Sequence, residues 1–181
     1  MKEVIWVMGP SAVGKETKKK TIAGDLKALK LLNMESESIV SCGASYHFNG
    51  NYKDDPIDKA REKIFDEIPD LLKNYDVVLI KWQHIDSELN RPERLKELLP
   101  EATHRAVLLV TPRHELAERL PIKSWWHDYG KELAHVNRGI EHVAKSLDTL
   151  PISMTLTIIL SSDKKFYSII NGNTDVESLY T

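Results

Sequence analysis

The chain has 181 residues, of which 41% are hydrophobic and 29% are charged, and its formal net charge is −2. These values are typical of one globular domain with a buried core, and they exclude a disordered chain and a strongly basic nucleic-acid-binding protein. The single cysteine, Cys42, cannot form an internal disulfide, and the apolar runs are too short for a signal peptide or a membrane span. We therefore expect a single cytoplasmic domain over residues 1–181, with no membrane partner and no nucleic-acid partner.

Five short apolar runs, separated by amphipathic stretches, define the expected order of elements. The runs cover residues 4–8, 38–42, 77–80, 106–110 and 154–160. Most of them lack a strict polar alternation, which is typical of strands that are buried on both faces of a parallel sheet. Helices are predicted between the runs, over residues 15–32, 56–73, 92–99, 112–120 and 130–147. This alternation predicts an α/β fold, doubly wound, with a five-stranded parallel sheet flanked by helices.

Prolines and a threonine indicate where some of these helices begin or end. Pro56 suits the first turn of the second helix, whereas Pro69 is predicted to kink or break that helix. Thr111, directly before Pro112, is a candidate N-cap for the fourth helix. Because doubly wound sheets bind ligands at the carboxyl ends of their strands, the residues that follow each strand are the candidate site residues.

The most informative motif follows the first expected strand and precedes an amphipathic stretch. It has the Walker A spacing and consists of Gly9, Pro10, Ser11, Ala12, Val13, Gly14 and Lys15. Small residues let the backbone wrap closely around phosphates, and the loop N–H groups and the helix N-terminus attract the negative charge. Lys15 adds a full positive charge for the β- and γ-phosphate oxygens. The motif therefore predicts a site for a nucleoside triphosphate.

One position departs from the usual motif. The residue after Lys15 is commonly a Ser or Thr that binds Mg²⁺, but here it is Glu16, followed by Thr17. A carboxylate binds Mg²⁺ directly or through water, and it also repels phosphates, so the two effects oppose each other. Thr17 remains available for a phosphate contact. Glu16 is therefore a candidate metal ligand as well as a candidate nucleotide-binding residue.

With this motif in its place after the first strand, the chain resembles the small P-loop kinases, the group that contains nucleoside monophosphate, shikimate and gluconate kinases. The resemblance extends over most of the chain in the order of elements, but only the phosphate loop is a specific motif. It implies the P-loop NTPase fold, ATP and Mg²⁺ as cofactors, and a small-molecule phosphoryl acceptor. It also implies that the acceptor binds around residues 41–55, with Arg61 one helical turn later.

The resemblance further implies a lid segment at about residues 119–138. In such kinases, lid cations neutralise the charge that develops on the transferred phosphoryl group. Arg119 and Lys123 are the first candidates, with Arg113 and Arg138 behind them. The alternative for Arg119 is a solvated helix face on which it pairs with Glu115.

Three further positions are assigned through the resemblance. The third strand lacks an acidic residue at its end, where Lys81 stands, so Asp86 is the remaining candidate for a water-mediated Mg²⁺ contact. Asp163 and Lys164 follow the fifth strand, in the loop that lies against the nucleobase in the resembling kinases. Trp125 and Trp126 either stack on a nucleobase or pack the lid against the body.

The leading hypothesis is an ATP- and Mg²⁺-dependent kinase that phosphorylates a small hydroxyl- or phosphate-bearing acceptor, such as a nucleotide, nucleoside, sugar or phosphonate-type metabolite. Glu16 and the missing carboxylate after the third strand favour an alternative, a nucleotide-binding regulatory module with little catalysis. An ATPase or GTPase switch is a third alternative, although no Asn-Lys-x-Asp guanine-reading segment is present. The sequence is compatible with a homodimer.

Overall fold

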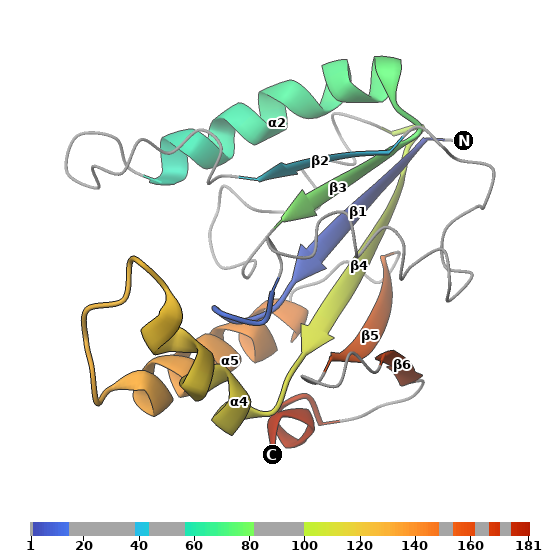
Figure 1. Cartoon of the computed structure of the whole chain (residues 1–181). Coiled ribbons are helices and arrows are strands. Elements are labelled where there is room, and N and C mark those ends of the chain that lie inside the picture. The colour runs from blue at the N-terminus through green and yellow to red at the C-terminus, as the bar shows by residue number, and fades with distance from the viewer. Residues whose placement is uncertain are drawn as a thin grey trace.

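The computed structural model describes residues 2–14, 39–43, 57–81, 100–148, 154–161, 167–170 and 175–181. Figure 1 shows the arrangement of its helices and strands. In chain order they are β1 (Glu3–Met8), β2 (Ile39–Gly43), α2 (Ile57–Asn74), β3 (Val77–Lys81), β4 (Thr103–Val110), α4 (Arg113–Arg119), η3 (Leu120–Ile122), α5 (Glu132–Asp148), β5 (Thr155–Ser161), β6 (Tyr167–Ile170) and η4 (Glu177–Tyr180).

The strands form one sheet in the order β2-β3-β1-β4-β5-β6. The pairings from β2 to β5 are parallel, and Trp6 of β1, for example, lies between Ile80 of β3 and Ala106 of β4. Strand β6 pairs with β5 in the antiparallel direction. The predicted class, a doubly wound α/β fold with a parallel sheet, is therefore confirmed, and the sheet has an additional antiparallel edge strand, β6, that was not predicted.

The core lies along the two central strands. Every residue of β1 from Val4 to Met8 is buried, and so is every residue of β4 from Ala106 to Val110. Each of these strands has a parallel neighbour on both sides and lacks polar residues over this range, so both of its faces contact apolar side chains. This packing explains why continuous apolar runs, without alternation, predicted the strands.

Helix α2 runs through Pro69, which lies inside it. The predicted break at this proline is therefore wrong. A proline inside a helix costs about 3 kcal/mol, because it removes one backbone hydrogen bond and crowds the preceding turn. Ile68 and Leu72, on either side of Pro69, are buried against the sheet, and burial of a large apolar side chain contributes about 1.5–3 kcal/mol each. Packing on both sides of the proline therefore offsets its cost.

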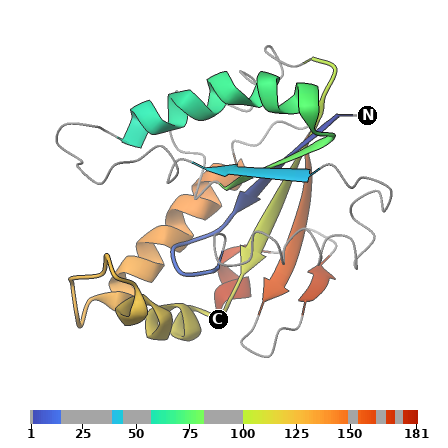
Figure 2. The same ribbon diagram turned by 45° about the horizontal axis from the view of Figure 1, so that its top comes forward.

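Helices α4 and α5 contact each other and lie near the loop that follows β1, as Figure 2 also shows. Helix α4 has Pro112 at its N-cap position, without a side-chain cap, while Thr111 is fully buried just before it. The predicted N-cap at Thr111 is therefore displaced by one residue. Helix α5 buries Val136, Ile140 and Val143 on one face, as its helical spacing of apolar residues predicts.

No helix in the part of the chain that the structure describes combines the length and the hydropathy needed to cross a bilayer.

Candidate triphosphate-binding site

The loop after β1 leaves the centre of the sheet at its carboxyl end. Because β1 lies between β3 and β4, this loop is flanked by the ends of both neighbours, as Figure 1 shows. Crevices at the carboxyl ends of parallel strands are where doubly wound folds bind their ligands. The sheet topology thus places residues 9–14 where a phosphate-binding loop is expected.

Gly9 makes the first bend of the loop and has no room for a side chain. Its φ angle is +147°, a backbone conformation that residues with a Cβ rarely adopt. A Cβ at this position would lie 2.9 Å from the carbonyl oxygen of Leu109 and 2.9 Å from Cγ1 of Val13. The loop backbone therefore lies directly against β4 at Gly9. Such a tight, side-chain-free bend is what a phosphate-binding loop requires.

The rest of the loop is held by one buried side chain and one turn. Val13 is fully buried, and its N–H donates to the carbonyl oxygen of Pro10 at 3.5 Å. Ala12 has a φ angle of +67°, the only positive value at a non-glycine position in the described residues. Gly14 also has a positive φ angle, +97°. Positive φ angles alternating with ordinary ones along a loop turn its backbone into the kind of concave surface that binds anions.

Helices α4 and α5 contact the outer side of the loop. A Cβ at Gly139, in the middle of α5, would lie 3.3 Å from Cβ of Pro10, so this helix approaches the loop closely. From α4, Nη1 of Arg119 donates to the carbonyl oxygen of Ala12 at 3.5 Å. The loop is thus bordered by two helices that are distant from it in the sequence.

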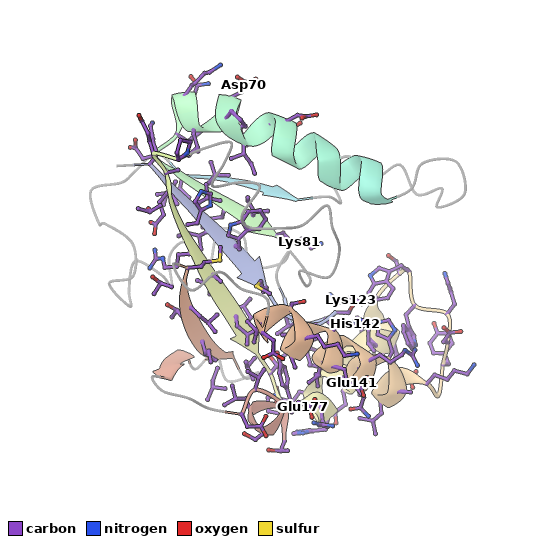
Figure 3. All side chains as sticks on the ribbon, turned by 180° about the vertical axis from the view of Figure 1, so that it is seen from behind. Asp70, Lys81, Lys123, Glu141, His142 and Glu177 are labelled. Carbon is purple, nitrogen blue, oxygen red and sulfur yellow. The ribbon has the colours of Figure 1, made fainter. Side chains whose placement is uncertain are left out.

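The predicted lid cations have different surroundings. Arg119 forms an ion pair with Glu115 at 3.4 Å, as the helix-face alternative predicted, and it also contacts the phosphate loop. Lys123 directly follows η3, and Figure 3 shows it beyond the carboxyl end of β1, on the side of α4 and α5. Arg113 is directed away from the loop, because it donates to the Tyr180 carbonyl oxygen of the C-terminal segment and to Asn137 Oδ1 of α5.

The two tryptophans of the segment between α4 and α5 differ in exposure. Trp126 is 4% exposed, packs edge-on against His135 at 5.0 Å between ring centroids, and donates from Nε1 to Glu132 Oε1 at 3.1 Å. Trp125 is 49% exposed. Trp126 therefore packs this segment against α5, which is the second of the two predicted alternatives, and only Trp125 has a solvent-facing ring.

The carboxylate of Glu132, at the start of α5, accepts hydrogen bonds from the Trp126 indole and from the Gly130 N–H. This arrangement is testable by titration. Hydrogen bonds from the backbone N–H groups of Glu132 itself and of Gly130, with the Trp126 indole, lower the pKa of its carboxyl group below the ordinary 4.5. Because the folded-state pKa is the lower one, the stabilisation is complete above pH 4.5 and is lost as the pH falls through the folded-state pKa.

We expect an NMR titration of the Glu132 side-chain carbon to give a pKa below 4.5 in the folded protein. The Trp126 indole N–H signal is expected to shift over the same pH range, since it bonds the same carboxylate. A Glu132→Gln variant serves as the control, because it lacks the titrating group and its indole signal should not follow that transition. A Glu132 pKa at or above the ordinary value would contradict the hydrogen-bonded arrangement.

The third strand ends as the sequence predicts. Lys81 is the last residue of β3, and Figure 3 shows it at the carboxyl end of the sheet. Asp76, which precedes β3, forms an ion pair with Lys2 at 3.2 Å, beside the start of β1. This acidic residue therefore lies at the end of the sheet opposite to the phosphate loop and is not part of the site.

Several predicted site residues lie outside the described residues. They are Lys15, Glu16, Thr17, Asp86, Asp163 and Lys164. The proposed acceptor region is described only for the backbone of residues 41–43 and, farther on, for the backbone around Arg61. Among the residues that are described, no group of three or more His, Cys, Asp or Glu side chains is arranged to hold a metal ion.

Two features of the loop were not predicted from the sequence: the close approach of Gly139 to Pro10 and the positive φ angle of Ala12. Gly139 lies in the middle of an amphipathic helix, where glycine is unfavourable by about 1 kcal/mol relative to alanine, and this anomaly indicates a close approach of another segment. The signal was therefore present, although it does not identify Pro10 as the partner. Ala12 gave no signal, because alanine rarely has a positive φ angle and nothing in its sequence context indicates one.

Comparisons with known proteins support the same fold. No protein-family model matches this chain, and no curated protein matches it. Among solved structures, a chain from the PezAT chromosomal toxin–antitoxin system of Streptococcus pneumoniae superposes with a TM-score of 0.55 at 13% identity, over 99% of this chain and 77% of that one. Shikimate kinase from Bacteroides thetaiotaomicron superposes with a TM-score of 0.54 at 15% identity, over 98% and 94% of the two chains.

Identities this low establish similarity of fold and leave the substrate undefined. The parallel sheet, the tight loop at Gly9 after its central strand and the superposition on shikimate kinase agree with one another. This chain therefore has a P-loop kinase-like fold.

Proposed function

We propose that this protein is an ATP-dependent kinase of small molecules, which transfers the γ-phosphoryl group to a hydroxyl- or phosphate-bearing acceptor such as a nucleotide, nucleoside, sugar or phosphonate-type metabolite. The observation that carries the proposal is the loop between Gly9 and Gly14. It leaves the central strand, has positive φ angles at Gly9, Ala12 and Gly14, and has no room for a side chain at its first bend. The similarity of the fold to shikimate kinase favours phosphoryl transfer over other nucleotide chemistry.

In the proposed reaction, an acceptor oxygen forms a bond to the γ-phosphorus as the bond to the bridging oxygen breaks. ADP leaves, and the acceptor hydroxyl loses its proton. The loop N–H groups and Lys15 hold the triphosphate, while Arg119 and Lys123 supply positive charge beside the transferred group. Bound Mg²⁺ would neutralise phosphate charge, with Glu16 and Asp86 as its proposed ligands. Positioning and charge neutralisation account for most of the catalysis of such reactions, so no strong base is required.

The proposal is tested by thermal-shift titration with ATP and GTP, each with and without Mg²⁺, on the wild type and on Lys15→Ala. A ligand held only by the folded state stabilises it by about 2.7 kcal/mol at a hundredfold excess over its dissociation constant. We expect ATP with Mg²⁺ to stabilise the wild type and to leave Lys15→Ala unchanged. ADP release is then measured with acceptors of the four classes.

The outcomes separate the kinase from the nucleotide-binding regulatory module. Acceptor-stimulated ADP release supports the kinase. Tight ATP binding without turnover on any acceptor class supports a nucleotide-binding regulatory module, which the lysine at the end of β3 also favours. If no nucleotide stabilises either protein, the triphosphate site itself is rejected, and the kinase proposal with it.

A further inference from the structure

We propose that Arg119 is a positioning residue, which holds the phosphate loop in its binding conformation before the nucleotide arrives. This task differs from charge neutralisation at the transferred phosphoryl group. The proposal rests on the proposed function in one respect only, the expectation that an ordered loop binds the nucleotide more tightly. Its structural part concerns the protein alone and is tested without any nucleotide.

The loop contains one residue whose backbone conformation is intrinsically disfavoured. Ala12 has a φ angle of +67°, where the Cβ of an L-residue crowds the following carbonyl group. Glycine tolerates this region without penalty, but alanine does not. A loop that keeps Ala12 in this conformation therefore needs contacts from its surroundings to favour it over alternative conformations.

Ala12 lies between two anchored residues, and Arg119 makes a hydrogen bond to its own carbonyl group. Val13 is anchored by its buried side chain and by its hydrogen bond to the Pro10 carbonyl oxygen. Pro10 is buried and packs close to Gly139 of α5. The carbonyl group of Ala12 and the N–H of Val13 belong to one planar peptide unit. Its N–H donates to the Pro10 carbonyl oxygen, and its carbonyl oxygen accepts from Nη1 of Arg119 at 3.5 Å, so Arg119 supplies a second hydrogen bond that holds the orientation of this unit.

Arg119 is itself well placed to hold that oxygen. Its helix is fixed by the fully buried side chain of Leu116, and Leu120, the first residue of η3, is fully buried directly after it. Its side chain is only 22% exposed, and Nη2 donates to Glu115 Oε2 at 3.4 Å. A planar guanidinium carries five N–H donors in a fixed fork, so it contacts the carboxylate and the loop carbonyl at the same time.

The consequence is a loop that already has its binding conformation before the nucleotide arrives. Ordering a mobile loop on binding lowers affinity, and a loop that is ordered in advance avoids this cost. Removing the Arg119 contact is therefore expected to affect the free protein first and the affinity for ATP as a result.

The experiment measures amide hydrogen exchange of Ser11, Ala12, Val13 and Gly14 in the nucleotide-free protein, by NMR, with the dissociation constant of ATP as the second readout. Arg119→Met is expected to speed exchange at these amides and to weaken ATP binding, each by about 3- to 10-fold, the range of one net hydrogen bond. Lys131→Met is the matched control. It removes one positive charge from an exposed position before α5, and both readouts should match the wild type.

The decisive variant is Ala12→Gly, because glycine adopts the positive φ angle without help. In the Ala12→Gly background, we expect Arg119→Met to change loop exchange and ATP affinity by less than about twofold, since the strain that Arg119 counteracts has been removed. The same loss in both backgrounds would overturn the proposal. So would wild-type exchange in Arg119→Met, even with weaker ATP binding or slower turnover, because Arg119 would then act on the nucleotide directly.

The proposal stays testable if Arg119→Met does not fold or if the wild type binds no ATP. If Arg119→Met is not folded by circular dichroism, Glu115→Gln replaces it, since it removes the ion pair that directs the guanidinium, and faster exchange at the same four amides is expected. Unchanged exchange in that variant would count against the proposal. If the wild type binds no ATP, the kinase proposal fails, but the exchange data on the free protein still accept or reject the positioning task.

Discussion

Replacing Gly9 with alanine is expected to destabilise the folded protein by about 2–6 kcal/mol and to abolish ATP binding. Two costs add at this position. A residue with a Cβ at a φ angle of +147° is strained, and the new Cβ would lie 2.9 Å from both the Leu109 carbonyl oxygen and Cγ1 of Val13. The strand below is fully packed, so the loop has to move away from β4, and its N–H groups then lose the common direction that phosphate binding requires.

Urea unfolding followed by tryptophan fluorescence measures the stability of this variant, and an ATP titration measures its affinity. Gly130→Ala is the matched control. Gly130 also has a positive φ angle, +88°, but a Cβ there would meet nothing within 4 Å. The control is therefore expected to lose about 1 kcal/mol from backbone strain alone, and to bind ATP as the wild type does.

The two variants separate strain from close packing. If Gly9→Ala costs no more than Gly130→Ala, the loop is not packed against β4 as the structure shows. If Gly9→Ala is destabilised but still binds ATP normally, the loop conformation at Gly9 is unrelated to nucleotide binding, and the observation that carries the proposed function is lost.

The sheet and its loop were predictable because both rest on local patterns. Apolar runs such as residues 4–8 predict strands that are buried on both faces, and the observed burial of β1 and β4 explains why. The phosphate loop was predictable because glycine spacing, a preceding strand and a following amphipathic stretch must occur together for the motif to be meaningful. Strand β6 was not predictable in this way, since it is short and joins the edge of the sheet in the opposite direction.

Side-chain placement around the loop was less predictable, because it depends on contacts between distant segments. Arg113 and Arg119 lie on the same short helix and look alike as lid candidates. The structure separates them, since Arg119 contacts the loop and Arg113 holds the C-terminal segment. Which direction each takes is decided by how α4 packs on the sheet and on α5, and no local pattern encodes that packing. Pro69 is a second example, because tertiary packing outweighs an intrinsic helix-breaking preference.

Replacing Tyr180 with alanine is expected to destabilise the protein by about 3–5 kcal/mol, the usual cost of deleting a large buried aromatic side chain. Tyr180 is fully buried although it is the penultimate residue. It belongs to η4, which contacts α5, and its carbonyl oxygen accepts a hydrogen bond from Nε of Arg113, in α4, at 3.3 Å. The C-terminal segment therefore contacts both helices that border the phosphate loop. Figure 1 shows it near the start of α4.

Tyr180→Phe separates the ring from its hydroxyl group. The hydroxyl is buried and has no hydrogen-bond partner among the described residues, and burial raises the pKa of the phenol above its ordinary value, so it stays protonated. Since a buried polar group without a partner costs about 1–3 kcal/mol, Tyr180→Phe is expected to be neutral or to stabilise the protein. Urea unfolding of both variants measures these changes in the free energy of unfolding. A loss below about 1 kcal/mol in Tyr180→Ala, far under the usual cost of such a deletion, would mean that η4 separates before the rest unfolds, and that α4 and α5 are held beside the loop by their mutual packing alone.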